Sequence, residues 1–126
     1  MKKLYKGRHW VASGGFHFIQ RTKNHQEIFV GDVKEKLTVV LEEVAQQFKM
    51  QDVTIKIYPS NFHLFYFCHG RAPIEVANTI IDAVTKMLKE KFNLEDVIDD
   101  VHYISTVDEI SPEFIQRLLI DTGLEK

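Results

Sequence analysis

VTIKIYPSNFHLFYFC, residues 53–68, decides the fold of this chain. Its first part alternates apolar with polar residues, the pattern of a strand with one face in water. Pro59-Ser60-Asn61 then has the composition of a tight turn. Phe62–Cys68 is apolar at nearly every position, which is typical of a central strand covered on both faces. The stretch therefore predicts two successive strands of one sheet.

One helix is predicted before these strands in the sequence, and another is predicted after them. Asp32, followed three residues later by Glu35, has the spacing of a capping box at a helix start. The helix that follows has one apolar stripe, Leu37, Val40, Leu41, Val44 and Phe48. After the strands, Pro73 suits the first turn of a second helix. Its stripe is Ile74, Ala77, Ile81, Val84 and Leu88.

The outer strands and a last helix come from the remaining sequence. Residues 10–21 indicate a first strand interrupted by Ser13-Gly14-Gly15, and glycines inside a strand mark a bulge or a close backbone approach. Residues 93–100 form an acidic connection, and residues 101–107 indicate a last strand. Ser111-Pro112 begins a final helix that carries Phe114, Ile115, Leu118 and Leu119 and ends at Gly123.

This order predicts an α+β, ferredoxin-like fold: an antiparallel β-α-β-β-α-β sheet with helices on one face and an extra C-terminal helix. We expect one domain over residues 1–126. No run approaches the roughly 18 apolar residues of a membrane span, and the basic start lacks the apolar stretch of a secretory signal. Cys68, the only cysteine, suggests a buried thiol in a reducing cytoplasm.

Charge is distributed unevenly along the chain. The net charge is −2, yet six cations precede the first acid, Glu27. They are Lys2, Lys3, Lys6, Arg8, Arg21 and Lys23. Such asymmetry indicates a basic face for a polyanion on an otherwise acidic body, although a solvated N-terminal tail explains it equally well.

Three segments, taken in order, carry a resemblance to a known family. Lys6-Gly7-Arg8-His9 is followed by Phe16-His17-Phe18 and Thr22-Lys23. Residues 59–64 fall where that family has Pro-Asp-His-hydrophobic-His-Leu, and residues 103–107 resemble its Tyr-hydrophobic-Arg-Thr-Val. The family is the single-tyrosine HUH transposases of small bacterial insertion sequences, and the spacings agree from about Tyr5 to Thr122.

The resemblance implies a chemistry whose residues are partly replaced here. In the family, two histidines bind a divalent cation, a tyrosine on the last helix attacks the scissile phosphate, and a glutamine one turn later adds a ligand. Asn61 stands at the first histidine position and His63 at the second. Leu118 stands at the nucleophile position and Thr122 at the glutamine position. We therefore expect a catalytically degenerate member without the standard reaction.

Nucleic-acid binding is the function that we still expect from the resemblance, because it does not depend on the replaced catalytic residues. The resemblance implies a homodimer, with sheets joined side by side, that binds structured single-stranded nucleic acid such as hairpin DNA or RNA. The single cysteine leads us to expect this homodimer in the cytoplasm. Phosphate contacts are expected from Lys6, Arg8, His9, Arg21 and Lys23. A weak, vestigial magnesium or manganese site is expected at His63, Asn61 and Asp121. Without the family pattern, His63 would be interpreted as a core histidine beside Phe65 and Phe67.

Two alternatives remain open. The first is an active, metal-dependent single-strand transposase or nickase with a shifted site, in which Tyr103 attacks and Asn61, His63 and Asp121 hold the metal. The second is a ferredoxin-like domain that assembles with protein partners and has lost nucleic-acid binding. The overall acidity favours the second alternative, and the clustered N-terminal cations oppose it.

Overall fold

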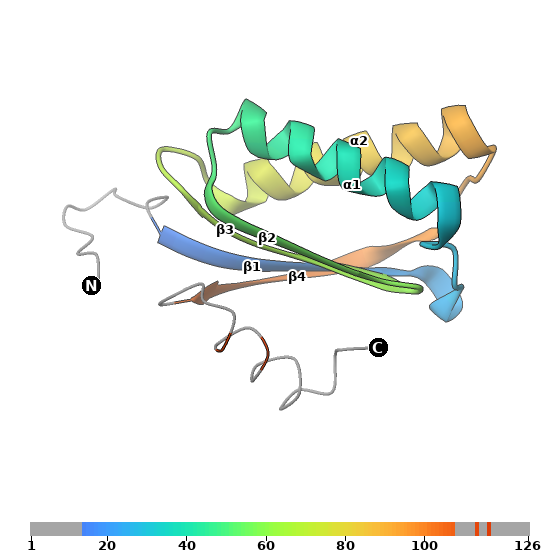
Figure 1. Cartoon of the computed structure of the whole chain (residues 1–126), viewed down its shortest axis with the longest axis horizontal. Helices are drawn as coiled ribbons and strands as arrows, with labels where there is room; N and C mark the ends of the chain where they lie inside the picture. The colour runs from blue at the N-terminus through green and yellow to red at the C-terminus, as the bar shows by residue number, and fades with distance from the viewer. Residues whose placement is uncertain (1–13, 108–112, 114–115, 117–126) are drawn as a thin grey trace.

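The computed structural model describes residues 14–107, 113 and 116. They form an α+β fold in which two helices cover one face of a four-stranded sheet (Figure 1). The elements are β1 (Gly14–Thr22), the 3-10 helix η1 (Lys23–His25), α1 (Gly31–Gln47), β2 (Gln51–Tyr58), β3 (Asn61–Cys68), α2 (Pro73–Phe92) and β4 (Ile98–Val107). The predicted ferredoxin-like order is confirmed. Of the predicted final helix, only Glu113 and Gln116 lie within the described residues.

The sheet has the strand order β2-β3-β1-β4, and every neighbouring pair is antiparallel. β3 is therefore an inner strand, as its continuous apolar sequence predicted. Its residues Phe62–Tyr66 are all buried. β2 and β4 are the two edge strands of the sheet.

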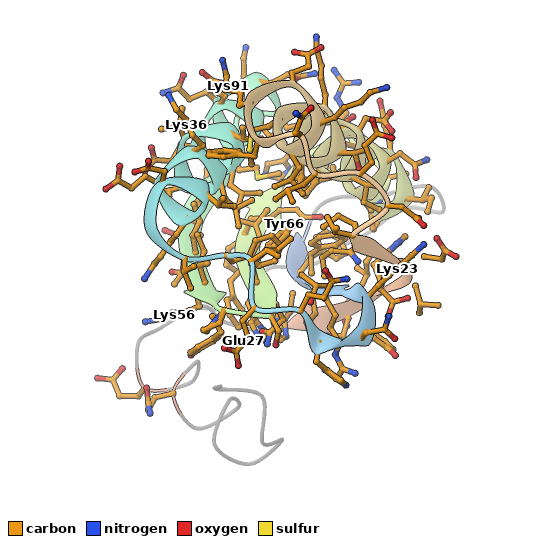
Figure 2. The ribbon with its side chains drawn as sticks, turned by 90° about the vertical axis from the view of Figure 1, so that its right-hand side faces the viewer. Lys23, Glu27, Lys36, Lys56, Tyr66 and Lys91 are labelled. Carbon is orange, nitrogen blue, oxygen red and sulfur yellow. The ribbon has the colours of Figure 1, made fainter. Side chains whose placement is uncertain are left out.

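The main core lies between the sheet and the two helices. Because side chains alternate along a strand, Phe16 and Phe18 of β1 face the helices together with Phe62, Leu64 and Tyr66 of β3. Figure 2 shows Tyr66 between the helices and the sheet, and burial raises its pKa. The helices contribute Leu37, Leu41, Val44, Phe48, Val76, Ala77, Ile80, Val84, Met87 and Leu88.

Both helices depart in detail from the predicted pattern. The capping box was wrong, because α1 begins at Gly31 and the side chain of its N-cap, Val30, makes no capping hydrogen bond. Asp32 lies inside the first turn, where a carboxylate still suits the helix dipole. In α2, Ile74 is 55% exposed, because it lies roughly opposite Val76 on the helix circumference. The predicted stripe therefore covered only one side of the buried helix face, which also includes Val76, Ile80 and Met87.

The contact between β1 and β4 depends on Gly15 and Gln20. A Cβ atom at Gly15 would lie 2.8 Å from the backbone oxygen of Val107, so the predicted close approach is confirmed. The irregularity in the pairing lies elsewhere, between Gln20 and Thr22. There the buried amide of Gln20 donates hydrogen bonds to the backbone oxygens of Asp99 at 3.0 Å and Val101 at 3.4 Å. These bonds hold residues 98–100 in β4, although the sequence pattern predicted that they belong to the acidic connection before the strand.

Two further expectations concern membranes and the single cysteine. Among the described residues, no helix has the length and apolar character that crossing a membrane requires. Cys68 is buried as predicted, and its Sγ lies 3.7 Å from the backbone oxygen of Phe48. Burial raises the pKa of the Cys68 thiol. The thiol is therefore a packing group of the core.

Candidate functional site

Four of the predicted site residues within the described part of the chain lie on the sheet face that is turned away from α1 and α2: Arg21, Asn61, His63 and Tyr103. Strand alternation puts the odd-numbered residues of β1 and β3 on this face, because the even-numbered residues face the helices. Ile19 pairs with His63 on β3 and with Tyr103 on β4, and Arg21 pairs with Asn61 on β3. The face thus carries His17, Ile19, Arg21, Asn61, His63, Phe65 and Tyr103.

A buried pair of histidines lies at the centre of this face. Nε2 of His17 is 2.9 Å from Nδ1 of His63, so one ring donates an N–H and the other accepts it. His17 is 3% exposed and His63 is fully buried. The ring of His17 stacks on Phe65 with centroids 4.0 Å apart, and the rings of Tyr58 and His63 are perpendicular with centroids 5.7 Å apart. Aromatic rings therefore hold both imidazoles in place.

The electrostatics of this pair follow from burial. Loss of hydration, and secondly the neighbouring His63, lower the pKa of His17 to about 4. His17 is therefore neutral at physiological pH. A neutral His17 imidazole can share a hydrogen bond with His63 in a buried position without the cost of desolvating a charge on His17.

Two of the three residues of the expected magnesium or manganese site, Asn61 and His63, lie within the described residues. Nδ1 of His63 is engaged with His17, so a metal ion could bind this ring only through Nε2. Across residues 14–107, 113 and 116, no three histidine, cysteine or carboxylate side chains gather as metal ligands would. Magnesium and manganese prefer several oxygen ligands. Asn61 lies beside His63 on this face, while Asp121, the remaining predicted ligand, lies outside the described residues.

The site residues of the shifted-site alternative are separated across the sheet. Tyr103 and His63 flank Ile19 on opposite sides, which puts their backbones about 10 Å apart at the usual strand spacing. The guanidinium carbon of Arg21 lies over the Tyr103 ring at 5.4 Å from its centroid. The described structure therefore brings Tyr103 to Arg21 and not to the predicted metal position. Leu118 and Thr122 lie outside the described residues.

The predicted phosphate-contacting cations have different environments. Lys23 is ion-paired with Asp96, and its Nζ lies 4.0 Å from Asp100. The hydrogen bond to Asp96 is the main cause that raises the pKa of Lys23. Figure 2 shows Lys23 on the side of the sheet where β4 lies, and Lys56 on the opposite side. Three further candidates, Lys6, Arg8 and His9, lie outside the described residues.

His17 is the site residue that sequence reasoning missed. Its segment was part of the family resemblance, but no role was predicted for the side chain. The available signal was a histidine between two phenylalanines in a strand, since a polar side chain in such a place needs a buried partner. That partner, His63, lies 46 residues further along the chain.

Comparison with known proteins identifies relatives of this chain. Residues 11–117 match the sequence profile of the family described as Transposase IS200 like. The ISDra2 transposase TnpA of Deinococcus radiodurans is 29% identical over 62 residues. That match covers 49% of this chain and 44% of the relative, so the chain spans less than half of the relative's length.

Two solved structures are similar in fold. A crystal structure of a protein described as a transposase from Deinococcus radiodurans aligns with a TM-score of 0.68 and 21% identity, over 94% of this chain and 97% of the other. The structure of a REP-associated tyrosine transposase bound to a REP hairpin aligns with a TM-score of 0.65 and 10% identity, over 97% and 76%. At these identities the likeness is one of fold.

Proposed function

Because the chain belongs to the IS200-like transposase family, we propose that it binds structured single-stranded nucleic acid in the cytoplasm and does not cleave it. A hairpin is the favoured ligand, since a protein of similar fold has its structure determined with a REP hairpin. Binding depends on surface cations and on the sheet, both of which persist without a nucleophile. DNA and RNA hairpins are both candidate ligands.

The observation that carries the loss of cleavage is the replacement of residues at the catalytic positions. Leu118 stands where the family has its nucleophilic tyrosine, and leucine has no nucleophilic atom. Asn61 provides an amide in place of the first metal-binding histidine, and His63, which keeps the second position, is fully buried beside His17. A metal that polarises a phosphate needs open coordination positions, and a fully buried imidazole offers poor access to them.

A binding and cleavage panel tests both halves of the proposal. Gel shifts with hairpin and linear DNA and RNA, with and without magnesium, should show hairpin binding that weakens as salt rises. Incubation of the DNA hairpin with magnesium or manganese should yield neither nicked product nor a covalent adduct. An adduct at Tyr103 would establish the shifted-site enzyme instead. No binding of any probe at low salt and micromolar protein would favour the domain that assembles with protein partners.

We also propose a homodimer whose sheets join at an edge. The apolar sequence of β3 is not evidence for a dimer, because β3 is an inner strand buried within one chain. Support comes instead from the two edges, since β2 and β4 each pair with only one neighbour among the described strands. Light scattering at tens of micromolar protein should give the mass of a dimer. A monomer at that concentration would contradict the proposal.

A further inference from the structure

Half-buried Arg21 and exposed Tyr103 form an aromatic–cation pair on the sheet face that carries the histidines. Their separation of 5.4 Å between guanidinium carbon and ring centroid is within the range of a cation–π contact. Tyr103 is 49% exposed, and its neighbour Val101 is 53% exposed. By contrast, His17 and Phe65 on the same face are buried. The pair therefore lies at the boundary between the buried centre of this face and the solvent-exposed edge strand β4.

The guanidinium of Arg21 keeps its hydrogen-bonding capacity. Within the part of the chain that the structure describes, its only interaction is the contact with Tyr103. Lys23, two residues further along, is instead neutralised by Asp96. Arg21 can therefore bind an anion directly, whereas Lys23 would first have to give up its ion pair with Asp96. Five N–H donors in one plane match the oxygens of a phosphate.

Tyr103 supplies the second component of a nucleic-acid site. An exposed aromatic ring on a sheet offers its face to an unpaired base, and this stacking accepts any base because every base has a π-face. Arg21 lies along the same ring, so its position is fixed before a ligand arrives. A base on Tyr103 would have its flanking phosphate within the reach of this side chain, since the guanidinium carbon of Arg21 lies 5.4 Å from the centre of the Tyr103 ring.

We propose that Arg21 and Tyr103 bind the single-stranded segment that flanks a hairpin, with an unpaired base stacked on Tyr103 and its phosphate accepting hydrogen bonds from Arg21. This inference rests on the proposed hairpin binding and names a location and a mode for it. The ligand is a single strand and not a duplex stem, because paired bases do not present their faces. Tyr103 acts here as a stacking platform and not as a nucleophile.

Two hairpin probes with the same stem test the proposal, one with a single-stranded flank and one with blunt ends. Tyr103→Ala should weaken binding of the flanked probe about tenfold or more and leave the blunt probe unchanged. Tyr103→Phe should stay within about twofold of the wild type, because the ring is retained. If Tyr103→Ala fails to fold, Tyr103→Leu preserves apolar bulk without a π-face and should show the same selective loss.

Salt dependence tests the phosphate contact. Arg21→Ala should reduce the slope of log affinity against log salt by about 0.7 for the flanked probe. Lys56→Ala is the matched control: it removes a cation from the opposite edge strand of the same sheet and should leave the slope unchanged. An equal reduction in both variants would overturn the site.

Two results separate failure of the site from failure of the function. Wild-type protein that binds the flanked probe while Tyr103→Ala and Arg21→Ala bind it equally well would overturn the site and keep the hairpin function. Wild-type protein that binds neither probe would overturn both.

Discussion

Acid should destabilise this protein through His17. The side chain is buried as a neutral imidazole, and its pKa falls from 6.5 to about 4 on folding. Below pH 6.5 the unfolded chain takes up a proton that the folded chain cannot hold. The stability contributed by His17 is therefore complete above pH 6.5 and is lost as the pH falls from 6.5 towards 4.

The size of this loss follows from the two pKa values. Since one pKa unit corresponds to about 1.4 kcal/mol, the full loss below both values is about 3 kcal/mol. At pH 5 the unfolded chain is nearly all protonated at this site and the folded chain is nearly all neutral, which gives a loss of about 2 kcal/mol. Such a difference is a large fraction of the stability of a small domain.

Urea unfolding at pH 7 and pH 5 measures the effect. The free energy of unfolding of the wild type should fall by about 2 kcal/mol more than that of His17→Gln, which cannot become charged. His25→Asn is the control, since His25 is exposed and its backbone has a positive φ that asparagine tolerates. It should lose as much stability as the wild type. A His17→Gln protein with the full wild-type loss would refute the assignment of this acid sensitivity to His17.

Three further predictions concern packing and charge. Gly15→Ala should lower the free energy of unfolding by about 1–3 kcal/mol, because the new methyl group would overlap Val107; an unchanged melting temperature would contradict this. Ile80→Ala should cost about 2–5 kcal/mol in urea unfolding, because Ile80 is fully buried between α2 and the sheet, and a smaller loss would mean that the core closes around the cavity. Asp96→Asn should release Lys23 and steepen the salt dependence of hairpin binding by about 0.7, whereas an unchanged slope would place Lys23 away from the ligand.

The fold was largely predictable because its patterns are local. The alternation in β2 and the continuous apolar run in β3 reflect one-sided and two-sided burial, which a sequence records directly. The capping box failed because spacing alone does not locate the first helical turn. The backbone oxygen of Val30 accepts hydrogen bonds from Val33 and Lys34, so the helix begins before Asp32 and needs no side-chain cap there.

The site was predictable only as single residues and not as pairs. The family pattern identified His63 and Asn61, and charge identified Arg21 and Lys23. Their actual neighbours are distant in sequence: Lys23 meets Asp96 from 73 residues away, and Arg21 meets Tyr103 across two strands. A single sequence holds no direct record of such contacts, so Lys23, which is ion-paired, and Arg21, which has no carboxylate partner among the described residues, could not be told apart.

The central position of β1 has a consequence for folding during synthesis. The side chain of Gln20 bonds to residues 79 and 81 positions downstream, so β1 leaves the ribosome long before β4 exists. The β2–β3 hairpin needs only a short turn and can form from adjacent sequence, whereas distant strand pairing is slow. During that interval Phe16, Phe18 and Ile19 lack their final cover. β1, which is largely buried in the finished protein, is thus a segment open to aggregation and chaperone capture in the nascent chain.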